Sequence, residues 1–230
     1  MEKDYENSIN FWNQFFNLSE ELKEKENKEL KEEDWEGLAP SSKVLEAIKD
    51  ISNSNNLLDY GCGNGWASIC ASKYGAKNIT AVDMANNAKE SVDFYADIFK
   101  AKGITAKSID DKWLDLQNDI YDAAICFNVL DVIPEEVTDN ILKGLYKALK
   151  MNAKLIISMN YYIDLTKDNK GFEIKNDRYI FINGILRLAS FTDDEWINKL
   201  SKYFKVLKLE HFSWPGEEVE RRRLFILEKN

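Results

Sequence analysis

The 230-residue sequence is poor in the residues that build metal clusters and disulfide frameworks. It contains three cysteines, Cys62, Cys70 and Cys126, and a single histidine, His211. The cysteines are scattered, odd in number and form no CxxC pair, so they predict neither a disulfide framework nor a cysteine metal site. One histidine excludes a histidine-rich site, and we expect no bound metal. Free cysteines are typical of a reducing compartment, which favours a cytoplasmic location.

Long apolar runs and an excess of basic residues are also lacking. No apolar stretch approaches the roughly 20 residues that span a bilayer, and the opening MEKDYENSINFW lacks the basic and apolar parts of a signal peptide. With 31 lysines and arginines against 40 acidic residues, the formal net charge is −9. Such a charge argues against binding to nucleic acid phosphates. Neither a membrane nor a nucleic acid is therefore an expected partner.

Negative charge is concentrated in the first 40 residues, which hold 12 acidic residues against five lysines. Within them, INFWNQFFNL (9–18) places aromatic residues at i,i+4 spacing, which predicts a short aromatic helix. The charge-dense stretch 19–37 predicts a solvated helix. We therefore divide the chain into an N-terminal helical extension, residues 1–40, and a main domain, residues 41–230. The aromatic helix either closes over a site as a lid or packs on the domain.

From residue 56 onward, short apolar strands alternate with helices of roughly 15 residues. Five strands are expected at 56–60, 78–83, 104–110, 121–129 and 153–162, and two more at 204–212 and 222–229. This alternation predicts βαβ units around a parallel sheet. Between the fifth and sixth strands, Asn183-Gly184 joins two β-rich runs and predicts a hairpin that pairs Ile180 with Arg187 and Tyr179 with Leu188. This hairpin belongs to an insert spanning residues 163–190.

The segment LLDYGCGNGW (57–66) carries the clearest chemical signal. Asp59 ends a strand and is followed by Gly61, Gly63 and Gly65. Glycines allow positive φ and a close approach of the backbone to a ligand, and the next helix N-terminus favours an anionic group. Asp83 ends the second strand, where it is placed to accept hydrogen bonds from ribose hydroxyls. A nucleoside cofactor is predicted; Trp66 occupies the third-glycine position of a dinucleotide fingerprint, which disfavours a dehydrogenase.

Asp59-x-Gly61-x-Gly63-x-Gly65, Asp83 and the run 109–136 together resemble class I S-adenosylmethionine-dependent methyltransferases. The resemblance is clear over roughly residues 41–160. It implies an α/β fold, a Rossmann-like three-layer sandwich with a seven-stranded, mostly parallel sheet whose last strand is antiparallel. The β-hairpin would be inserted after the fifth strand. The resemblance also implies S-adenosylmethionine as the cofactor.

The resemblance implies roles for individual residues of the cofactor site. The glycine-rich loop, Gly61, Cys62, Gly63 and Gly65, would cradle the methionine part of the cofactor. Asp59 would support its amino group, directly or through water, and Asp83 would bind the ribose. Three further positions would contact the cofactor: Met84 on the adenine, Asp110 or its neighbour Asp111 on the adenine amino group, and Asn128 through its backbone carbonyl. Asp110 and Asp111 could equally be surface acids.

All five arginines lie beyond residue 175, and several are expected near the strand ends where ligands of parallel sheets collect. Because arginine suits carboxylate and phosphate groups, we hypothesise a small acceptor that bears one. The candidate substrate-binding residues are Tyr162, Arg178, Arg187, Trp214 and Arg221. The candidate catalytic residues are His211 and Asp131, as proton acceptors, and Tyr161. Exposed arginines on strand edges and an ordinary histidine at a strand end are the alternative interpretations.

The function predicted from these patterns is methyl transfer from S-adenosylmethionine to a small-molecule acceptor, with an anionic acceptor favoured. Two alternatives remain open. The protein could methylate a protein or peptide, for which the acidic surface suits a basic partner, or it could bind S-adenosylmethionine without catalysis. Methyl transfer needs alignment of the acceptor more than a nucleophilic side chain, so the lack of a nucleophile triad fits an enzyme.

Overall fold

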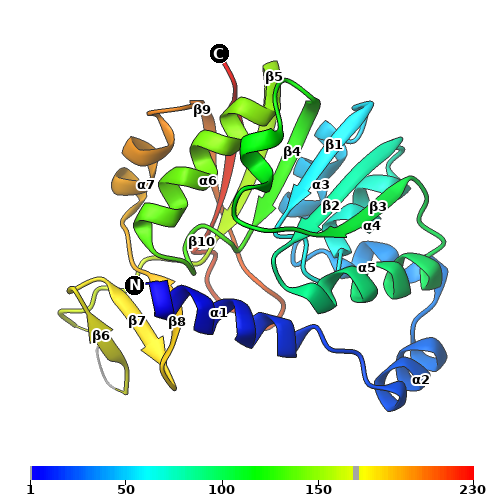
Figure 1. Ribbon diagram of the computed structural model, residues 1–230, viewed down its shortest axis with the longest axis horizontal. Coiled ribbons are helices and arrows are strands. Elements are labelled where there is room, and N and C mark those ends of the chain that lie inside the picture. Colours follow the sequence, from blue (N-terminus) through cyan, green and yellow to red (C-terminus); the bar gives the residue numbers. More distant parts are fainter. Residues whose placement is uncertain (1, 168–170) are drawn as a thin grey trace.

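The computed structural model describes residues 2–167 and 171–230, and its centre is a seven-stranded sheet (Figure 1). The strands of this sheet are β1 (Asn56–Tyr60), β2 (Asn78–Asp83), β3 (Ile104–Ser108), β4 (Tyr121–Phe127), β5 (Leu149–Met159), β9 (Lys205–Phe212) and β10 (Arg222–Glu228). Their order is β3-β2-β1-β4-β5-β10-β9. The first five strands pair in parallel, and β10 is antiparallel to both β5 and β9. The predicted seven-stranded Rossmann-like sheet is confirmed.

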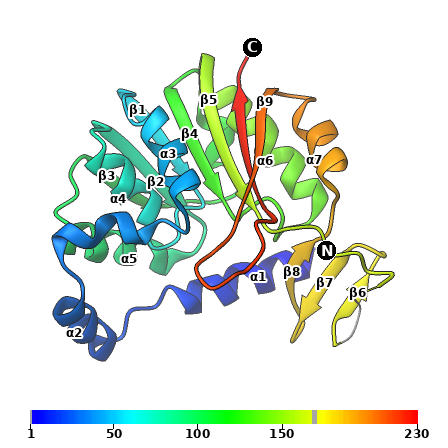
Figure 2. The ribbon, with the colours of Figure 1, turned by 180° about the vertical axis from the view of Figure 1, so that it is seen from behind.

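Helices cover both faces of the sheet and complete a three-layer sandwich (Figures 1 and 2). They are α3 (Ser42–Ile51), α4 (Trp66–Lys73), α5 (Asn86–Ile98), α6 (Glu135–Ala148) and α7 (Asp193–Leu200), with a short 3-10 helix η2 (Trp113–Leu116) after β3. In the central strand β4, Ile125 and Phe127 belong to the core that includes α3 and α4, whereas Ala124 and Cys126 belong to the core that includes α6. This period of two divides the buried residues between the two layers.

Three elements precede the sandwich: α1 (Glu2–Phe15), α2 (Glu20–Glu29) and the 3-10 helix η1 (Glu32–Leu38). The aromatic helix predicted at 9–18 is therefore longer toward the N-terminus and ends at Phe15. Helix α1 lies across the carboxyl ends of the parallel strands, between α5 and the small sheet (Figures 1 and 2). Helix α2 buries no residue, which agrees with the solvated helix predicted in the charged stretch.

The segment after β5 forms a second, three-stranded antiparallel sheet. Its strands are β6 (Glu173–Lys175), β7 (Tyr179–Ile182) and β8 (Ile185–Ala189). The hairpin over Asn183-Gly184 is present, and β6 adds a strand that the sequence did not predict. The insert predicted at 163–190 includes residues 168–170, which lie outside the described residues.

The hairpin begins with the pairs Ile182–Ile185 and Phe181–Leu186, and the predicted register is wrong beyond them. Ile180 pairs with Leu188 and Tyr179 with Ala189, because the register shifts by one residue at Arg187, which forms a bulge in β8. An extra residue of this kind moves the following side chains to the other face of the strand. Leu188 therefore lines a cavity together with Ile180, as described below.

The bounds of β3, β4 and β5 also differ from the prediction, and β4 ends at Phe127. Strand β3 ends at Ser108, before the acidic pair 110–111, and β5 begins at Leu149 directly after α6 and ends at Met159. The segment 160–162 consequently follows β5 as a loop. No helix within 2–167 and 171–230 is long and apolar enough to cross a membrane.

Candidate functional site

The loop between β1 and α4 carries three glycines with left-handed backbone conformations. Their φ angles are +73° at Gly61, +52° at Gly63 and +80° at Gly65, values that side chains with a Cβ rarely adopt. The backbone amides of Gly61 and Cys62 donate to the carbonyl of Val82, at 2.8 and 3.1 Å. The loop is thereby tied to the end of β2 and brought beside the residue that follows Val82.

That residue, Asp83, joins the glycine-rich loop to the start of α5. One carboxylate oxygen accepts from the backbone amide of Gly63 at 3.0 Å, and the other accepts from the amide of Ala85 at 2.8 Å. Burial raises the pKa of Asp83, whereas these backbone amides act in the opposite direction. Each carboxylate oxygen retains a further acceptor position for a ligand, and Asp83 lines the large cavity described next.

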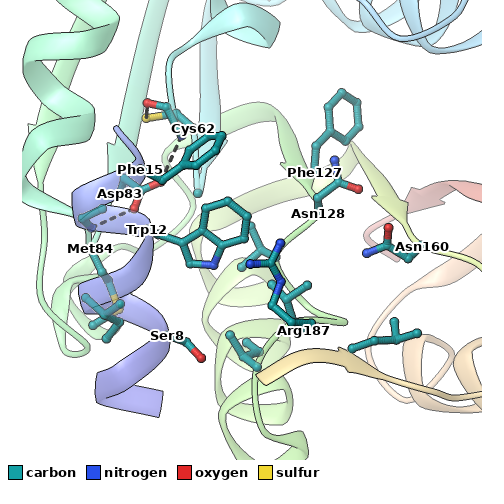
Figure 3. A pocket seen from close by; sticks show the side chains of 18 of the residues that line it. Ser8, Trp12, Phe15, Cys62, Asp83, Met84, Phe127, Asn128, Asn160 and Arg187 are labelled. Carbon is teal, nitrogen blue, oxygen red and sulfur yellow. Dashed lines mark hydrogen bonds between the residues drawn. The ribbon is translucent and has the colours of Figure 1, made fainter. Parts of the chain in front are cut away.

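A cavity of about 650 Å³ opens at the carboxyl ends of the strands. The glycine-rich loop and Asp83 form one end, the residues after β4 and β5 form another side, and α1 and the small sheet close the remainder. Figure 3 shows Cys62, Asp83 and Met84 on one side, Asn128 and Asn160 on the other, and Trp12 and Arg187 between them. This volume lies in the range of small-molecule sites, roughly 300–1,000 Å³.

The predicted cofactor residues divide into those that line the cavity and those that do not. Gly61, Cys62, Gly63, Asp83, Met84 and Asn128 line it, whereas Asp59, Gly65, Asp110 and Asp111 do not. Both Asp110 and Asp111 are exposed, and their neighbour Ile109 lines the cavity in their place. Burial raises the pKa of the Cys62 thiol well above its usual value, which keeps this group neutral and unreactive.

Asp59 is buried beneath the glycine-rich loop. Its carboxylate accepts a hydrogen bond of 2.6 Å from the hydroxyl of Ser68, which lies in the first turns of α4. Burial raises the pKa of Asp59 to about 7, the hydrogen bond from Ser68 acts against this rise, and the charge of Asp83 adds to it. Asp59 is therefore a carboxyl group whose charge state changes near neutral pH.

Helix α1 supplies many of the cavity residues that local sequence patterns do not assign to the site. Six of them line the cavity: Tyr5, Ser8, Ile9, Trp12, Phe15 and Phe16, the last just beyond the end of the helix. A Cβ added to Gly63 would lie 2.8 Å from the ring of Phe16, so this ring rests directly on the glycine-rich loop. The i,i+4 spacing of the aromatic residues indicates that they share one face of a helix, but such a pattern does not show what that face packs against.

Polar contacts hold α1 to the segment between β2 and α5, on one side of the cavity. The side chain of Asn13 accepts from the backbone amide of Asn87 at 2.9 Å, and the side-chain amide of Asn87 donates to the carbonyl of Asn13 at 2.8 Å. The hydroxyl of Tyr5 donates to the sulfur of Met84 at 3.0 Å. Burial, together with the charges of Asp111 and Asp83, raises the pKa of Tyr5 to about 12, so this hydroxyl keeps its proton.

The predicted substrate-binding residues are also divided by the structure. Arg187 and Trp214 line the cavity, whereas Tyr162, Arg178 and Arg221 do not. Arg178 lies 3.1 Å from Glu195 in an ion pair and stacks on Phe191. Arg221 stacks on the ring of Tyr161 at 3.6 Å from its centroid.

Of the three predicted catalytic residues, only Tyr161 lines the cavity. His211 lies in the edge strand β9, where its Nε2 is 3.0 Å from the carboxylate of Asp193 in α7. The other oxygen of Asp193 accepts from the buried Arg223 at 2.5 Å. His211 is therefore part of a contact between α7 and the last two strands.

Asp131 is fully buried behind Asn160, which does line the cavity. One of its oxygens accepts from the backbone amide of Asn160 at 2.7 Å and from its side-chain amide at 2.8 Å, and the other has no partner in the described chain. Burial raises the pKa of Asp131. The side-chain oxygen of Asn160 accepts from Arg222 at 2.5 Å, and Arg222 in turn pairs with Glu217. Asp131 thus fixes the orientation of a cavity residue.

The sequence matches a known protein family, and the fold resembles known structures. A profile of the family described as methyltransferase domain matches residues 32–200, well over half of the chain. A protein structure from Pyrococcus horikoshii aligns with a TM-score of 0.67 and 17% identity over 82% of this chain and 89% of that one. No curated protein matches at the level of sequence.

Two solved methyltransferases share the fold. The 1,6-didemethyltoxoflavin-N1-methyltransferase of Burkholderia thailandensis, solved with 1,6-didemethyltoxoflavin and S-adenosylhomocysteine, has a TM-score of 0.66 and 16% identity, covering 85% of this chain and 80% of that one. The magnesium protoporphyrin IX methyltransferase of Synechocystis, solved with S-adenosylhomocysteine, has a TM-score of 0.63 and 18% identity, covering 85% and 83%. These structures show the shared fold, and the family match shows that the chain belongs to the methyltransferase domain family, within the class I S-adenosylmethionine-dependent superfamily.

Proposed function

We propose that this protein transfers a methyl group from S-adenosylmethionine to a small-molecule acceptor. The observation that carries the proposal is a single cavity that joins two unlike regions. At one end the carboxylate of Asp83 is bonded to the amide of Gly63 in the glycine-rich loop. At the other end lie the apolar side chains of the small sheet and α1. A cofactor end and an acceptor end in one cavity are what methyl transfer requires.

The residues at the cofactor end fit S-adenosylmethionine. Gly61 and Gly63 line the cavity with backbone that carries no side chain, and Asp83 retains acceptor positions suited to ribose hydroxyls. Met84 offers an apolar surface for the adenine, and we propose that Asn128 contributes its backbone carbonyl. Asp59 supports the loop from below and, once ionised, favours the positively charged amino group of the cofactor.

S-adenosylmethionine supplies a methyl group already activated by a positively charged sulfur. The protein's own contribution is then to align the acceptor and to exclude water, because alignment alone lowers a bimolecular barrier by several kcal/mol. Asp131 positions Asn160, and Tyr161 follows it into the cavity. We propose that Asn160 and Tyr161 contact the acceptor, and that His211, bonded to Asp193 outside the cavity, serves the structure instead.

A small acceptor is favoured over a protein side chain by the position of α1. This helix crosses the carboxyl ends of the strands, and its residue Trp12 and the following Phe16 form part of the cavity wall. A peptide segment would need α1 to move away, whereas a small molecule is enclosed by it. We therefore propose that α1 acts as a lid over both ligands.

Calorimetric titration with S-adenosylhomocysteine tests the cofactor part of the proposal. We expect measurable binding to the wild type and at least about tenfold weaker binding to Asp83→Ala, since hydrogen bonds to a charged group contribute about 1.5–3 kcal/mol. The matched control is Asp50→Ala, which removes an exposed aspartate in α3. Equal affinity of the Asp83→Ala variant and the wild type would contradict the proposed site.

Turnover tests the catalytic part. Incubation with S-adenosylmethionine and a metabolite extract should form S-adenosylhomocysteine, and removal of small molecules from the extract should abolish that formation. Cofactor binding without turnover would favour a binding protein, and turnover only with the macromolecular fraction would favour a protein or peptide acceptor.

A further inference from the structure

The arginines of this chain differ in whether the protein itself neutralises them. Three form ion pairs: Arg178 with Glu195, Arg222 with Glu217, and Arg223 with Asp193. Arg221 is exposed and lies outside the cavity. Arg187 lines the cavity, and its guanidinium has neither an ion pair nor a hydrogen bond with any residue in 2–167 or 171–230.

The contacts of Arg187 are aromatic. Its guanidinium lies 4.6 Å from the ring centroid of Phe11 and 5.3 Å from that of Trp12, both on α1. Such contacts favour the positive charge and orient the planar group, but they satisfy none of its five N–H donors. The bulge in β8 sets the side chain at this place, and Figure 3 shows it beside Trp12 in the middle of the cavity.

Many of the side chains that line the cavity with Arg187 are apolar. Ile180, Ile182 and Leu188 from the small sheet and Val132 and Ile133 from the loop after β4 line the same cavity. An unpaired charge in such surroundings loses part of its hydration, and that loss is recovered only by an anionic partner with good hydrogen-bond geometry. The planar fork of arginine matches the two oxygens of a carboxylate or phosphate.

We infer that Arg187 binds a carboxylate or phosphate group of the methyl acceptor, whose remaining body is apolar. This inference rests on the proposed function, because it assigns the acceptor end of the same cavity. It also replaces the broader expectation that several arginines share this role, since Arg178 is paired with Glu195. The anion-binding residue is then attached to the small sheet and covered by α1.

Binding of matched probes tests the inference without any methyl transfer. The probes are 4-phenylbutyrate and phenyl phosphate, which carry the two possible anions, and the neutral 4-phenylbutyramide and phenol, each titrated into the protein by calorimetry. We expect at least one anion to bind about tenfold or more tightly than its neutral counterpart, as for a charge-assisted hydrogen-bond pair. The anion that shows the larger preference identifies the acceptor group.

Three variants locate the preference. Arg187→Met keeps the length and apolar stem of the side chain and should abolish the preference, whereas Arg187→Lys should retain part of it. Arg178→Met, which removes an arginine paired outside the cavity, should leave the preference intact. Equal or undetectable binding of charged and neutral probes, or a preference that survives in Arg187→Met, would overturn the inference.

A separate titration keeps this result distinct from the proposed function. Arg187→Met should bind S-adenosylhomocysteine as the wild type does, which also shows that the variant is folded. Loss of the anion preference with retained S-adenosylhomocysteine binding supports the assignment of Arg187. Failure of S-adenosylhomocysteine to bind the wild type would instead contradict the proposed function, whatever the probes show.

Discussion

Replacing Asp59 by asparagine tests how strongly burial acts on the carboxyl group beneath the glycine-rich loop. Burial raises the pKa of Asp59 from 3.8 to about 7, and the hydrogen bond from Ser68 offsets only part of this rise. Because the folded-state pKa lies above the unfolded value, the folded protein holds an additional proton between about pH 4 and pH 7. The stability that Asp59 contributes is therefore complete below pH 4 and is lost as the pH rises through 7.

Within this pH range, each pH unit changes the free energy of unfolding by about 1.4 kcal/mol. From about pH 5 to pH 8, the free energy of unfolding of the wild type should fall by about 3 kcal/mol relative to Asp59→Asn. The asparagine keeps an oxygen acceptor for Ser68 and does not titrate. Urea unfolding followed by tryptophan fluorescence at the two pH values measures this difference.

The control for this experiment is Asp50→Asn, which alters an exposed aspartate in α3 and should show no such dependence on pH. Any effect of pH on stability that the wild type shares with both variants cancels in the comparison. If the stability difference between the wild type and Asp59→Asn were the same at both pH values, the buried carboxyl would titrate normally and the reasoning would be refuted.

Three further predictions concern the loop, the buried network and the lid. Gly63→Ala should lower the free energy of unfolding by about 1–2 kcal/mol and weaken S-adenosylhomocysteine binding. Gly184→Ala, at a similar positive φ in open space, should lower only the stability. Equal S-adenosylhomocysteine affinity of the two variants would contradict this prediction. Asp131→Ala leaves the backbone amide of Asn160 without its acceptor and should lower the free energy of unfolding, measured in urea, by about 1–3 kcal/mol. A loss smaller than about 0.5 kcal/mol would contradict this prediction. Deleting residues 1–18 should weaken S-adenosylhomocysteine binding at least about tenfold, because Tyr5, Trp12 and Phe16 line the cavity; unchanged calorimetric affinity would argue against a lid.

The glycine-rich loop illustrates what a local pattern can predict. The left-handed conformations of Gly61, Gly63 and Gly65 depend on steric limits of single residues, so the glycines signal them directly. The same holds for the hairpin over Asn183-Gly184, whose turn chemistry is contained in two residues. Alternation of apolar strands and helices likewise predicts the parallel sheet, because each βαβ unit needs a crossover helix.

The hairpin register illustrates what a local pattern leaves open. Leu186 packs in the core and Leu188 faces the cavity, and both surroundings accept an apolar side chain. Apolar spacing alone therefore does not reveal the extra residue at Arg187. The bulge depends on how β8 packs against the rest of the molecule, and it decides where the Arg187 side chain lies.

His211 shows the same limit at the level of the sheet. The end of its strand lies near the cavity, which Trp214 lines, but β9 is the outermost strand of the sheet, and α7 places Asp193 against the histidine. The acidic pair 110–111 follows a strand that ends before it, so Ile109 faces the cavity instead. Neither outcome is encoded within a few neighbouring residues.

The sequence by itself determined the α/β class, the glycine-rich turn, the acidic end of β2 and the aromatic face of α1, since each depends on steric or periodic properties of nearby residues. Only the tertiary structure decided that α1 covers the cavity, that Arg187 enters it without a carboxylate partner among the described residues, and that His211 stays outside it. These placements depend on contacts between residues far apart in the chain, and the packing of whole elements selects among several partners that the local pattern permits equally.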